Sequence, residues 1–129
     1  MKKFGGIDGC KGGWILCEID RSKPSISFIH ALDEINALEF DTLLIDIPLY
    51  FADRAHRPSE IQAKNLLKKR GASIFFTPVK EAIFEKSYEE GLKINRRLIG
   101  KGFSKQAYYL FPKIKEAAGF KEKNRNLIF

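Results

Sequence analysis

The sequence predicts one α/β domain whose sheet joins three antiparallel strands to a fourth, parallel strand. Two observations lead to this prediction. Short apolar segments near the N-terminus are separated by turn residues, a pattern typical of meandering strands. A later apolar run at residues 42–47 is closed by Pro48 and is predicted to be buried on both faces, as central parallel strands are. The length of 129 residues suits a single domain with one hydrophobic core.

The first two strands are expected at residues 3–8 and 14–20, joined as a hairpin. The glycine-rich segment at residues 9–13 can adopt the positive φ of a tight turn. A further turn leads to a third strand at 25–30, whose polar and apolar residues alternate as in a half-buried strand. A short helix at 32–38 is expected before the fourth strand.

Two helices are predicted in the middle of the chain. Pro58 suits the first position of a helix over 58–69, and Gly71 is a plausible stop. Thr77 is a candidate N-cap for a second, short helix over 78–84, because proline follows it at the first helical position.

Two longer helices are predicted after these. Residues 87–90 form a capping box, with Ser87 as N-cap, for a helix that ends near Gly100. Ser104 caps a last helix, which Pro112 is expected to kink and Gly119 to end. Three meandering strands, a helix and a further strand form the order that opens the RNase H-like fold.

The net charge of +7 is unevenly distributed along the sequence. Residues 1–90 hold 13 Lys/Arg and 14 Asp/Glu, a net charge of −1, whereas residues 91–129 hold 10 and 2, a net charge of +8. This asymmetry is consistent with a polyanionic partner such as nucleic acid, but solvated outer faces of two helices explain it as well.

Several classes of protein are excluded or disfavoured. No apolar run approaches the roughly 20 residues that a membrane helix needs. The N-terminus shows no apolar signal-peptide core, so a cytoplasmic location is expected. The two cysteines, Cys10 and Cys17, do not form a CxxC pair, so neither a zinc site nor a dithiol site is predicted.

Two aspartates are the leading candidates for chemistry. Asp8 ends the first predicted strand and Asp46 ends the fourth, so neighbouring strands would bring both carboxylates to one edge of the sheet. Hard oxygen ligands in that arrangement suit Mg²⁺ or Mn²⁺. Asp46 lies in an apolar run, where burial without a partner is costly. The alternative interpretation is that each aspartate only stabilises a turn.

Further candidates are weaker. Glu60 falls in the first turn of a helix, where it either favours the helix dipole or serves as a third carboxylate. Lys11 at the hairpin tip could contact a phosphate or simply be solvated. Lys105 belongs to a mixture of cations and aromatics that could grip a nucleic-acid backbone, although a solvated helix face explains it equally. Arg70 is a further candidate for contact with a phosphate or a nucleic-acid backbone.

Five motifs follow one another along nearly the whole chain: Gly6-Ile7-Asp8-Gly9-Cys10-Lys11-Gly12-Gly13-Trp14, Ile45-Asp46-Ile47-Pro48-Leu49, Arg70-Gly71-Ala72-Ser73-Ile74-Phe75 with Thr77-Pro78, Ser104-Lys105-Gln106-Ala107, and Pro112-Lys113-Ile114-Lys115-Glu116. In this order they resemble domain-of-unknown-function family 429, a family of predicted RNase H-like nucleases. The resemblance implies a metal-dependent nuclease or phosphodiesterase that acts on nucleic acid. It implies that Asp8 and Asp46 bind Mg²⁺ or Mn²⁺, with Glu60 assisting.

The sequence departs from the family pattern in two places. The family usually has a Cys-Asp pair where this chain has Ser59-Glu60, so the carboxylate is kept on a longer stem. Family members also continue past this C-terminus, so we expect a single domain over 1–129 that lacks the last sheet strand and helix of the family. Residues 126–129 are predicted to begin that strand.

Two other functions stay open at this stage. The first is a catalytically silent, truncated member that acts as a binding or assembly module. The second is a phosphate-binding half-domain of the actin-like ATPase type, because those domains also open with an Asp-Gly hairpin on a related sheet. With the last strand missing, the fourth strand would lie near an uncovered edge, and such edges invite pairing. We therefore expect a homodimer that covers Leu43, Leu44, Ile45 and the C-terminal helix.

Overall fold

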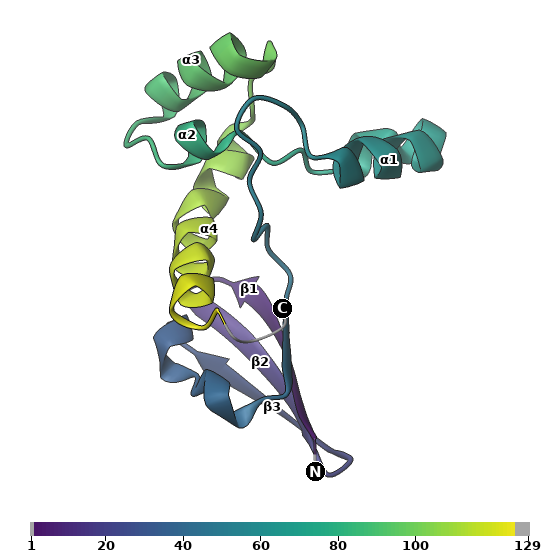
Figure 1. The fold of residues 1–129 in the computed structure, drawn as a ribbon, viewed down its shortest axis with the longest axis vertical. Coiled ribbons are helices and arrows are strands. Elements are labelled where there is room, and N and C mark those ends of the chain that lie inside the picture. The colour runs from purple at the N-terminus through teal and green to yellow at the C-terminus, as the bar shows by residue number, and fades with distance from the viewer. Residues whose placement is uncertain (1, 126–129) are drawn as a thin grey trace. The chain divides into compact units, whose positions relative to one another are not determined.

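A computed structural model describes residues 2–125 (Figure 1). The strand predicted at residues 126–129 lies outside them. The chain divides into two compact units. We call residues 1–49 with 113–129 the sheet unit, and residues 50–112 the helical unit. The prediction of a single domain over 1–129 stays a prediction.

The sheet unit contains a four-stranded mixed sheet. Its strands are β1 (Lys3–Cys10), β2 (Gly13–Asp20), β3 (Lys23–Ile29) and β4 (Thr42–Ile45), in the order β3-β2-β1-β4. β2 pairs antiparallel with both β1 and β3, whereas β4 pairs parallel with β1. The predicted combination of three antiparallel strands and one parallel strand is therefore confirmed. Gly12 in the first turn has a φ of 81°, which explains why glycine is required there.

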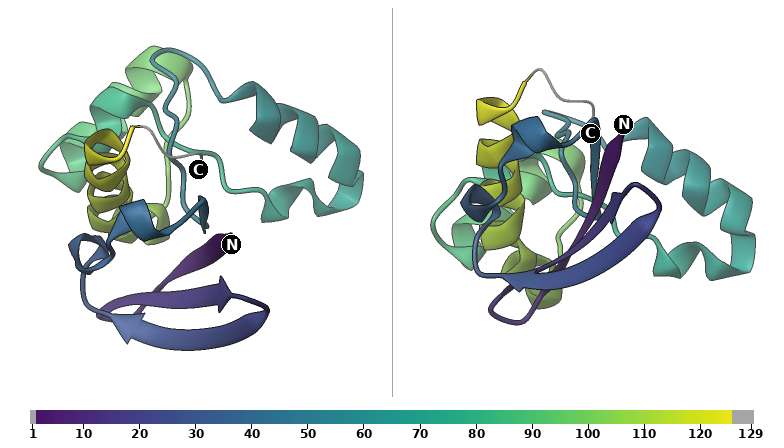
Figure 2. Two further views of the ribbon diagram at one scale, coloured as in Figure 1. Left: turned by 60° about the horizontal axis from the view of Figure 1, so that its bottom comes forward. Right: turned by 90° about the horizontal axis from the view of Figure 1, so that it is seen from below.

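One face of this sheet carries the core. The C-terminal part of α4 (Lys105–Lys123) and the short 3-10 turns η1 (Leu32–Glu34) and η2 (Ala37–Glu39) lie over it, as Figure 2 shows. The buried side chains form one cluster: Ile7, Trp14, Leu16, Leu32, Ile35, Ala37, Phe40, Leu43, Ala117 and Phe120. Burial of each large side chain contributes about 1.5–3 kcal/mol, so this cluster is the main source of the unit's stability.

The opposite face of the sheet is apolar and exposed. Ile26 is 74% exposed, Leu44 62% and Phe4 42%. The predicted burial of the fourth strand on both faces is therefore wrong, since Leu43 is fully buried while its neighbour Leu44 is open to solvent. The prediction that the third strand is half-buried is wrong as well, because β3 lies at the edge of the sheet and most of its residues are exposed.

The helical unit contains α1 (Pro58–Leu67), η3 (Lys68–Ser73), α2 (Lys80–Ile83), α3 (Tyr88–Ile99) and the first turns of α4. Local capping rules predicted several boundaries correctly. Pro58 occupies the first turn of α1, and the Ser87 hydroxyl accepts a hydrogen bond from the Glu90 amide at the start of α3. Gly100 ends α3 in the left-handed conformation.

Other boundaries differ from prediction. The helix expected at 32–38 is two 3-10 turns. α2 begins at Lys80 rather than at Pro78, because Thr77 is held by Glu60 instead of capping a helix. Gly119 does not end α4, which continues to Lys123. Gly71 does not end α1. The helix ends at Leu67, and the residue with positive φ that follows it is Lys68. Among residues 2–125, no helix is long and apolar enough to cross a membrane.

Candidate functional site

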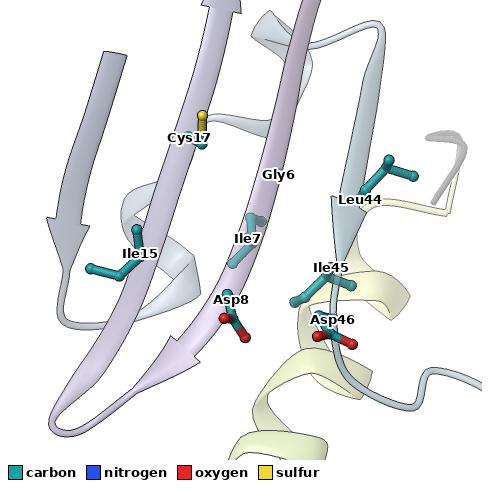
Figure 3. A pocket seen from close by; sticks show the side chains of 8 residues that line it. All are labelled: Gly6, Ile7, Asp8, Ile15, Cys17, Leu44, Ile45 and Asp46. Atoms are coloured by element: carbon teal, nitrogen blue, oxygen red, sulfur yellow. The ribbon is translucent and has the colours of Figure 1, made fainter. Parts of the chain in front are cut away.

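The exposed face of the sheet contains a shallow groove of about 520 Å³ that crosses β1, β2 and β4. Eight residues line it: Gly6, Ile7, Asp8, Ile15, Cys17, Leu44, Ile45 and Asp46. Figure 3 shows Asp8 and Asp46 at one end of the groove, with Cys17 and Leu44 toward the other. Most of the lining is apolar, so the two carboxylates are its distinguishing chemical groups.

The strand register explains why the two aspartates meet. Ile7 pairs with Ile45 across the parallel strands, and the Asp46 amide donates to the Ile7 carbonyl oxygen at 2.9 Å. Asp8 and Asp46 are each the next residue along, so their side chains leave the same face of neighbouring strands. Neighbouring strands lie about 4.8 Å apart, which is a separation that one cation can bridge. The structure thus brings these two predicted site residues together.

Both carboxylates are exposed, and this corrects the expectation that Asp46 is buried. Asp46 lies on the uncovered face of the sheet, where its side chain is open to solvent. Within the described part of the sheet unit, no hydrogen bond or ion pair engages either carboxylate group. Four hard oxygen atoms are therefore available to a ligand.

The donor set defines what the site can hold. Among residues 2–125, no cluster of three or more His, Cys, Asp or Glu side chains is placed to hold a metal ion. A resident ion at Asp8 and Asp46 would therefore have two carboxylate ligands and otherwise water or substrate oxygens. Mg²⁺ is often bound in this way, through one or two carboxylates together with substrate phosphates.

Two lysines lie at the hairpin tip next to β1. Lys11 is in the turn and is exposed, so it stays free to meet a phosphate. Lys113, from α4, donates from Nζ to the Gly13 carbonyl oxygen at 2.5 Å, and its ammonium lies 4.5 Å from the Trp14 ring centroid. Lys113 therefore holds the turn in place against α4. Sequence reasoning gave it no such role.

Glu60 belongs to the helical unit and is only 5% exposed. Its Oε1 accepts hydrogen bonds from the Thr77 amide at 3.0 Å and the Thr77 hydroxyl at 2.5 Å. Arg57 Nε lies 3.0 Å from the same oxygen as an ion pair, although its N–H finds no hydrogen-bond acceptor among the described residues. Glu60 thus joins α1 to the segment before α2, which sufficiently explains a carboxylate at this position.

The remaining two candidates, Arg70 and Lys105, also lie in the helical unit. Arg70 is exposed in η3, and Lys105 begins α4 with its ammonium 5.7 Å from the Tyr88 ring centroid. Both belong to the part of the chain that carries the positive charge. The helical unit holds 13 Lys/Arg and 6 Asp/Glu, whereas the sheet unit holds 10 of each.

Sequence reasoning missed one carboxylate that organises the sheet unit. Glu116 on α4 accepts a hydrogen bond from Trp14 Nε1 at 3.1 Å with one oxygen and from the Leu32 amide at 2.8 Å with the other. It therefore connects α4, β2 and η1 beside the core. Its position between the buried residues Ile114 and Ala117 is the signal that could have identified it.

The comparisons with known proteins identify a family and no function. The comparison with curated proteins gave no match. The comparison with solved structures gave none either. A family model matches residues 6–128, which include Asp8, Asp46 and the helices α1 to α4. The chain therefore belongs to the family described as "Protein of unknown function (DUF429)".

Proposed function

We propose that this protein is a phosphodiesterase that acts on nucleic acid with a divalent cation, Mg²⁺ or Mn²⁺, held by Asp8 and Asp46. One observation carries the proposal. Two carboxylates leave the same face of neighbouring parallel strands and open onto a shared groove. Their oxygens match the ligands that these cations prefer. A divalent ion there polarises a phosphoryl oxygen and makes water a stronger nucleophile.

Residues of the chain itself would hold the cation and attract the substrate. Asp8 and Asp46 would hold the ion at the end of the groove, and the parallel pairing of β1 with β4 places them on neighbouring strands. Lys11, in the turn that follows β1, is positioned to attract a phosphate toward the same end of the strand. The positive charge of the helical unit attracts the polyanion without regard to sequence.

The assisting role predicted for Glu60 stays a prediction. Its Oε1 is occupied by Thr77, while Oε2 is buried without a hydrogen-bond partner among the described residues. Only Oε2 is therefore left to accept a bond from water. A direct contact between Glu60 and the cation is not part of the proposal.

The test combines binding and cleavage. Calorimetry measures Mn²⁺ binding to the unmodified chain, to Asp8→Asn and to Asp46→Asn, and cleavage is followed on single-stranded, duplex and hybrid substrates. We expect each substitution to lower the cleavage rate by about 100-fold or more, the usual loss when a group that stabilises developing charge is removed. Asp20→Asn is the matched control. Asp20 is an exposed aspartate that lies opposite Lys3 in the strand register, at the end of the hairpin away from Asp8. Cleavage that survives both substitutions would exclude this site.

The exposed apolar face favours a second candidate function, assembly with another copy of the chain. β4 lies at the edge of the sheet, and Leu44 beside that edge is 62% exposed. An exposed apolar edge invites pairing with another chain. The proposed homodimer covers β4 and the C-terminal helix. Sedimentation at micromolar concentration should show a dimer that Leu44→Lys dissociates, and a clean monomer for the unmodified chain would reject it.

A further inference from the structure

A second pocket, of about 350 Å³, lies within the helical unit and has a different chemical character from the groove. Its lining combines cations with apolar rings: His56, Ile61, Lys64, Phe76, Lys101 and Gly102. We propose that this pocket binds a nucleotide, with its phosphate between Lys64 and Lys101 and its flat ring against Ile61 and Phe76. The proposal does not depend on the metal site.

Two buried polar side chains, Glu60 and Asn95, hold together the segments that line the pocket. Glu60 holds Thr77, and with it the neighbouring Phe76, to α1. Asn95, 2% exposed, accepts from the Val79 amide at 2.9 Å and donates to the Lys101 carbonyl oxygen at 2.8 Å. These bonds link three segments, α1, residues 76–79 and the loop after α3. The pocket is therefore a fixed part of the fold.

Two cations, Lys64 and Lys101, line the pocket, and neighbouring glycines pack against Lys64 and Arg96. Gly71 is buried, and a Cβ at its position would lie 2.9 Å from Lys64 Cγ, so Gly71 packs directly on the Lys64 stem. A Cβ at Gly102 would lie 3.3 Å from Arg96 Nε, which brings a third cation beside the pocket. Among the described residues, neither Lys64 nor Lys101 forms an ion pair with an acidic side chain. Their charges are therefore available to an anion.

The apolar part of the pocket is aromatic. The Phe76 ring meets the His56 ring edge-on at 4.7 Å between centroids, and the Lys64 ammonium lies 5.4 Å from the Phe76 centroid. Rings of this kind stack with bases, and a neighbouring cation attracts the attached phosphate. His56 Nδ1 is buried without a hydrogen-bond partner among the described residues. A ligand or a bridging water could satisfy that atom.

The size of the pocket sets the class of ligand. A volume of 350 Å³ is near the lower end of the range of about 300–1,000 Å³ for small-molecule sites. A mononucleotide has the required flat ring and a dianionic phosphate. It can arrive as a free nucleotide or as the terminal nucleotide of a single strand, and both present the same chemistry.

Calorimetry on the full chain tests the proposal with four probes: AMP, adenosine, inorganic phosphate and a 5′-phosphorylated dinucleotide. We expect AMP to bind at least about tenfold more tightly than adenosine or phosphate, because each lacks one half of the contacts. A dinucleotide that binds more tightly than AMP identifies a strand end as the source, and equal binding identifies the free nucleotide.

Variants separate this pocket from a general attraction between charges. Lys64→Gln and Lys101→Gln should each weaken AMP binding by about tenfold, whereas Lys80→Gln, on α2 and outside the pocket, should leave it unchanged. Asp8→Asn should also leave AMP binding intact, so loss of the metal site and loss of this pocket are told apart. Equal binding of AMP and adenosine, or an unchanged affinity in the double variant of Lys64 and Lys101, would overturn the proposal.

Discussion

The sheet unit and the helical unit differ most in charge. The sheet unit balances 10 Lys/Arg against 10 Asp/Glu, while the helical unit has 13 against 6 and so carries the whole net charge of +7. The sequence had placed the basic character in residues 91–129. In the fold, the basic C-terminal end of α4 belongs to the sheet unit, which is neutral as a whole, and Lys123 pairs there with Asp33 at 3.2 Å. Charge counted along the chain therefore does not show which unit carries the excess of positive charge.

The two units also differ in how one carboxyl group in each is hydrogen-bonded: Glu116, which is partly buried, and Glu60, which is buried. Glu116 in the sheet unit uses both oxygens, on Trp14 and on Leu32. Glu60 in the helical unit uses only Oε1, and its Oε2 has no hydrogen-bond partner among the described residues. A fully paired group adds stability, whereas an unpaired buried atom costs free energy. Glu116 therefore stabilises the sheet unit, whereas His56 and Glu60 in the helical unit each have a buried polar atom without a hydrogen-bond partner among the described residues.

The largest effect is expected in the core of the sheet unit. Trp14→Ala should lower the free energy of unfolding by about 3–5 kcal/mol, because it leaves a cavity and removes the donor to Glu116. Phe28→Ala, on the exposed face of the same sheet, should cost less than about 1 kcal/mol. Urea denaturation followed by circular dichroism measures both. Equal losses would show that the open face is covered in solution.

The second prediction compares the two carboxyl groups directly. Glu116→Gln should cost about 1–3 kcal/mol, since an amide can accept from only one of the two donors and turns its own N–H groups toward the other. Glu60→Gln should cost more, about 3 kcal/mol, because Arg57 loses its ion-pair partner and the new amide N–H groups are buried without an acceptor. Paired denaturation curves give the two values, and the reverse order would contradict the comparison.

The third prediction concerns salt. The logarithm of the duplex-binding constant falls linearly with the logarithm of salt concentration, and each phosphate contact contributes about 0.9 to the slope. Replacing Lys68, Lys69 and Arg70 together by Gln should therefore make this slope about 2–3 less steep. Fluorescence anisotropy at several salt concentrations measures it.

A matched triple variant in the sheet unit serves as control for the salt experiment. Lys23, Lys121 and Lys123, all replaced by Gln, remove the same charge from the neutral unit. We expect a change in slope of less than about 1. If the two triple variants behave alike, the division of charge between the units has no bearing on nucleic-acid binding.

The smallest effect is expected at the start of β1, where Lys3 contacts Glu18 and Glu39. The Lys3 ammonium holds the pKa of Glu39 below its usual value of 4.5, with a smaller effect from Asn36, and Glu18 and then Glu39 raise the pKa of Lys3 above 10.5. Because folding lowers the pKa of Glu39, its ionised carboxylate stabilises the fold above pH 4.5, and this stabilisation is lost as the pH falls through the lowered pKa. The raised pKa of Lys3 stabilises below pH 10.5, and this is lost as the pH rises through the raised value.

Thermal unfolding of the unmodified chain and of Glu39→Gln between pH 3 and 7 checks this prediction. The difference in melting temperature should be small at pH 7 and should vanish toward pH 3, because the pair is exposed and screened by solvent. A difference that grows as the pH falls would have the wrong sign.

Local rules account for what the sequence predicted correctly. The antiparallel meander followed from apolar segments separated by turn residues, and Gly12 confirms the need for positive φ. Ser87 and Gly100 were assigned correctly because capping depends only on residues a few positions away. The family was recognised from motifs in order, and its model matches residues 6–128. Asp8 and Asp46 were expected to meet because each was predicted to end its strand. That is wrong for Asp8, since β1 continues to Cys10, and the pairing of Ile7 with Ile45 brings the two aspartates together instead.

The sequence by itself determined which segments become strands and helices, because those choices depend on neighbours along the chain. Only the tertiary structure decided which faces are covered. Leu43 and Leu44 are equally apolar, yet one is buried and the other is exposed, since α4 and the 3-10 turns cover one face of the sheet only. Glu60 and Glu116 acquire their roles from partners 17 and up to 102 residues away. Hydrophobic periodicity marks a residue as apolar, but burial depends on a second element that packs against it.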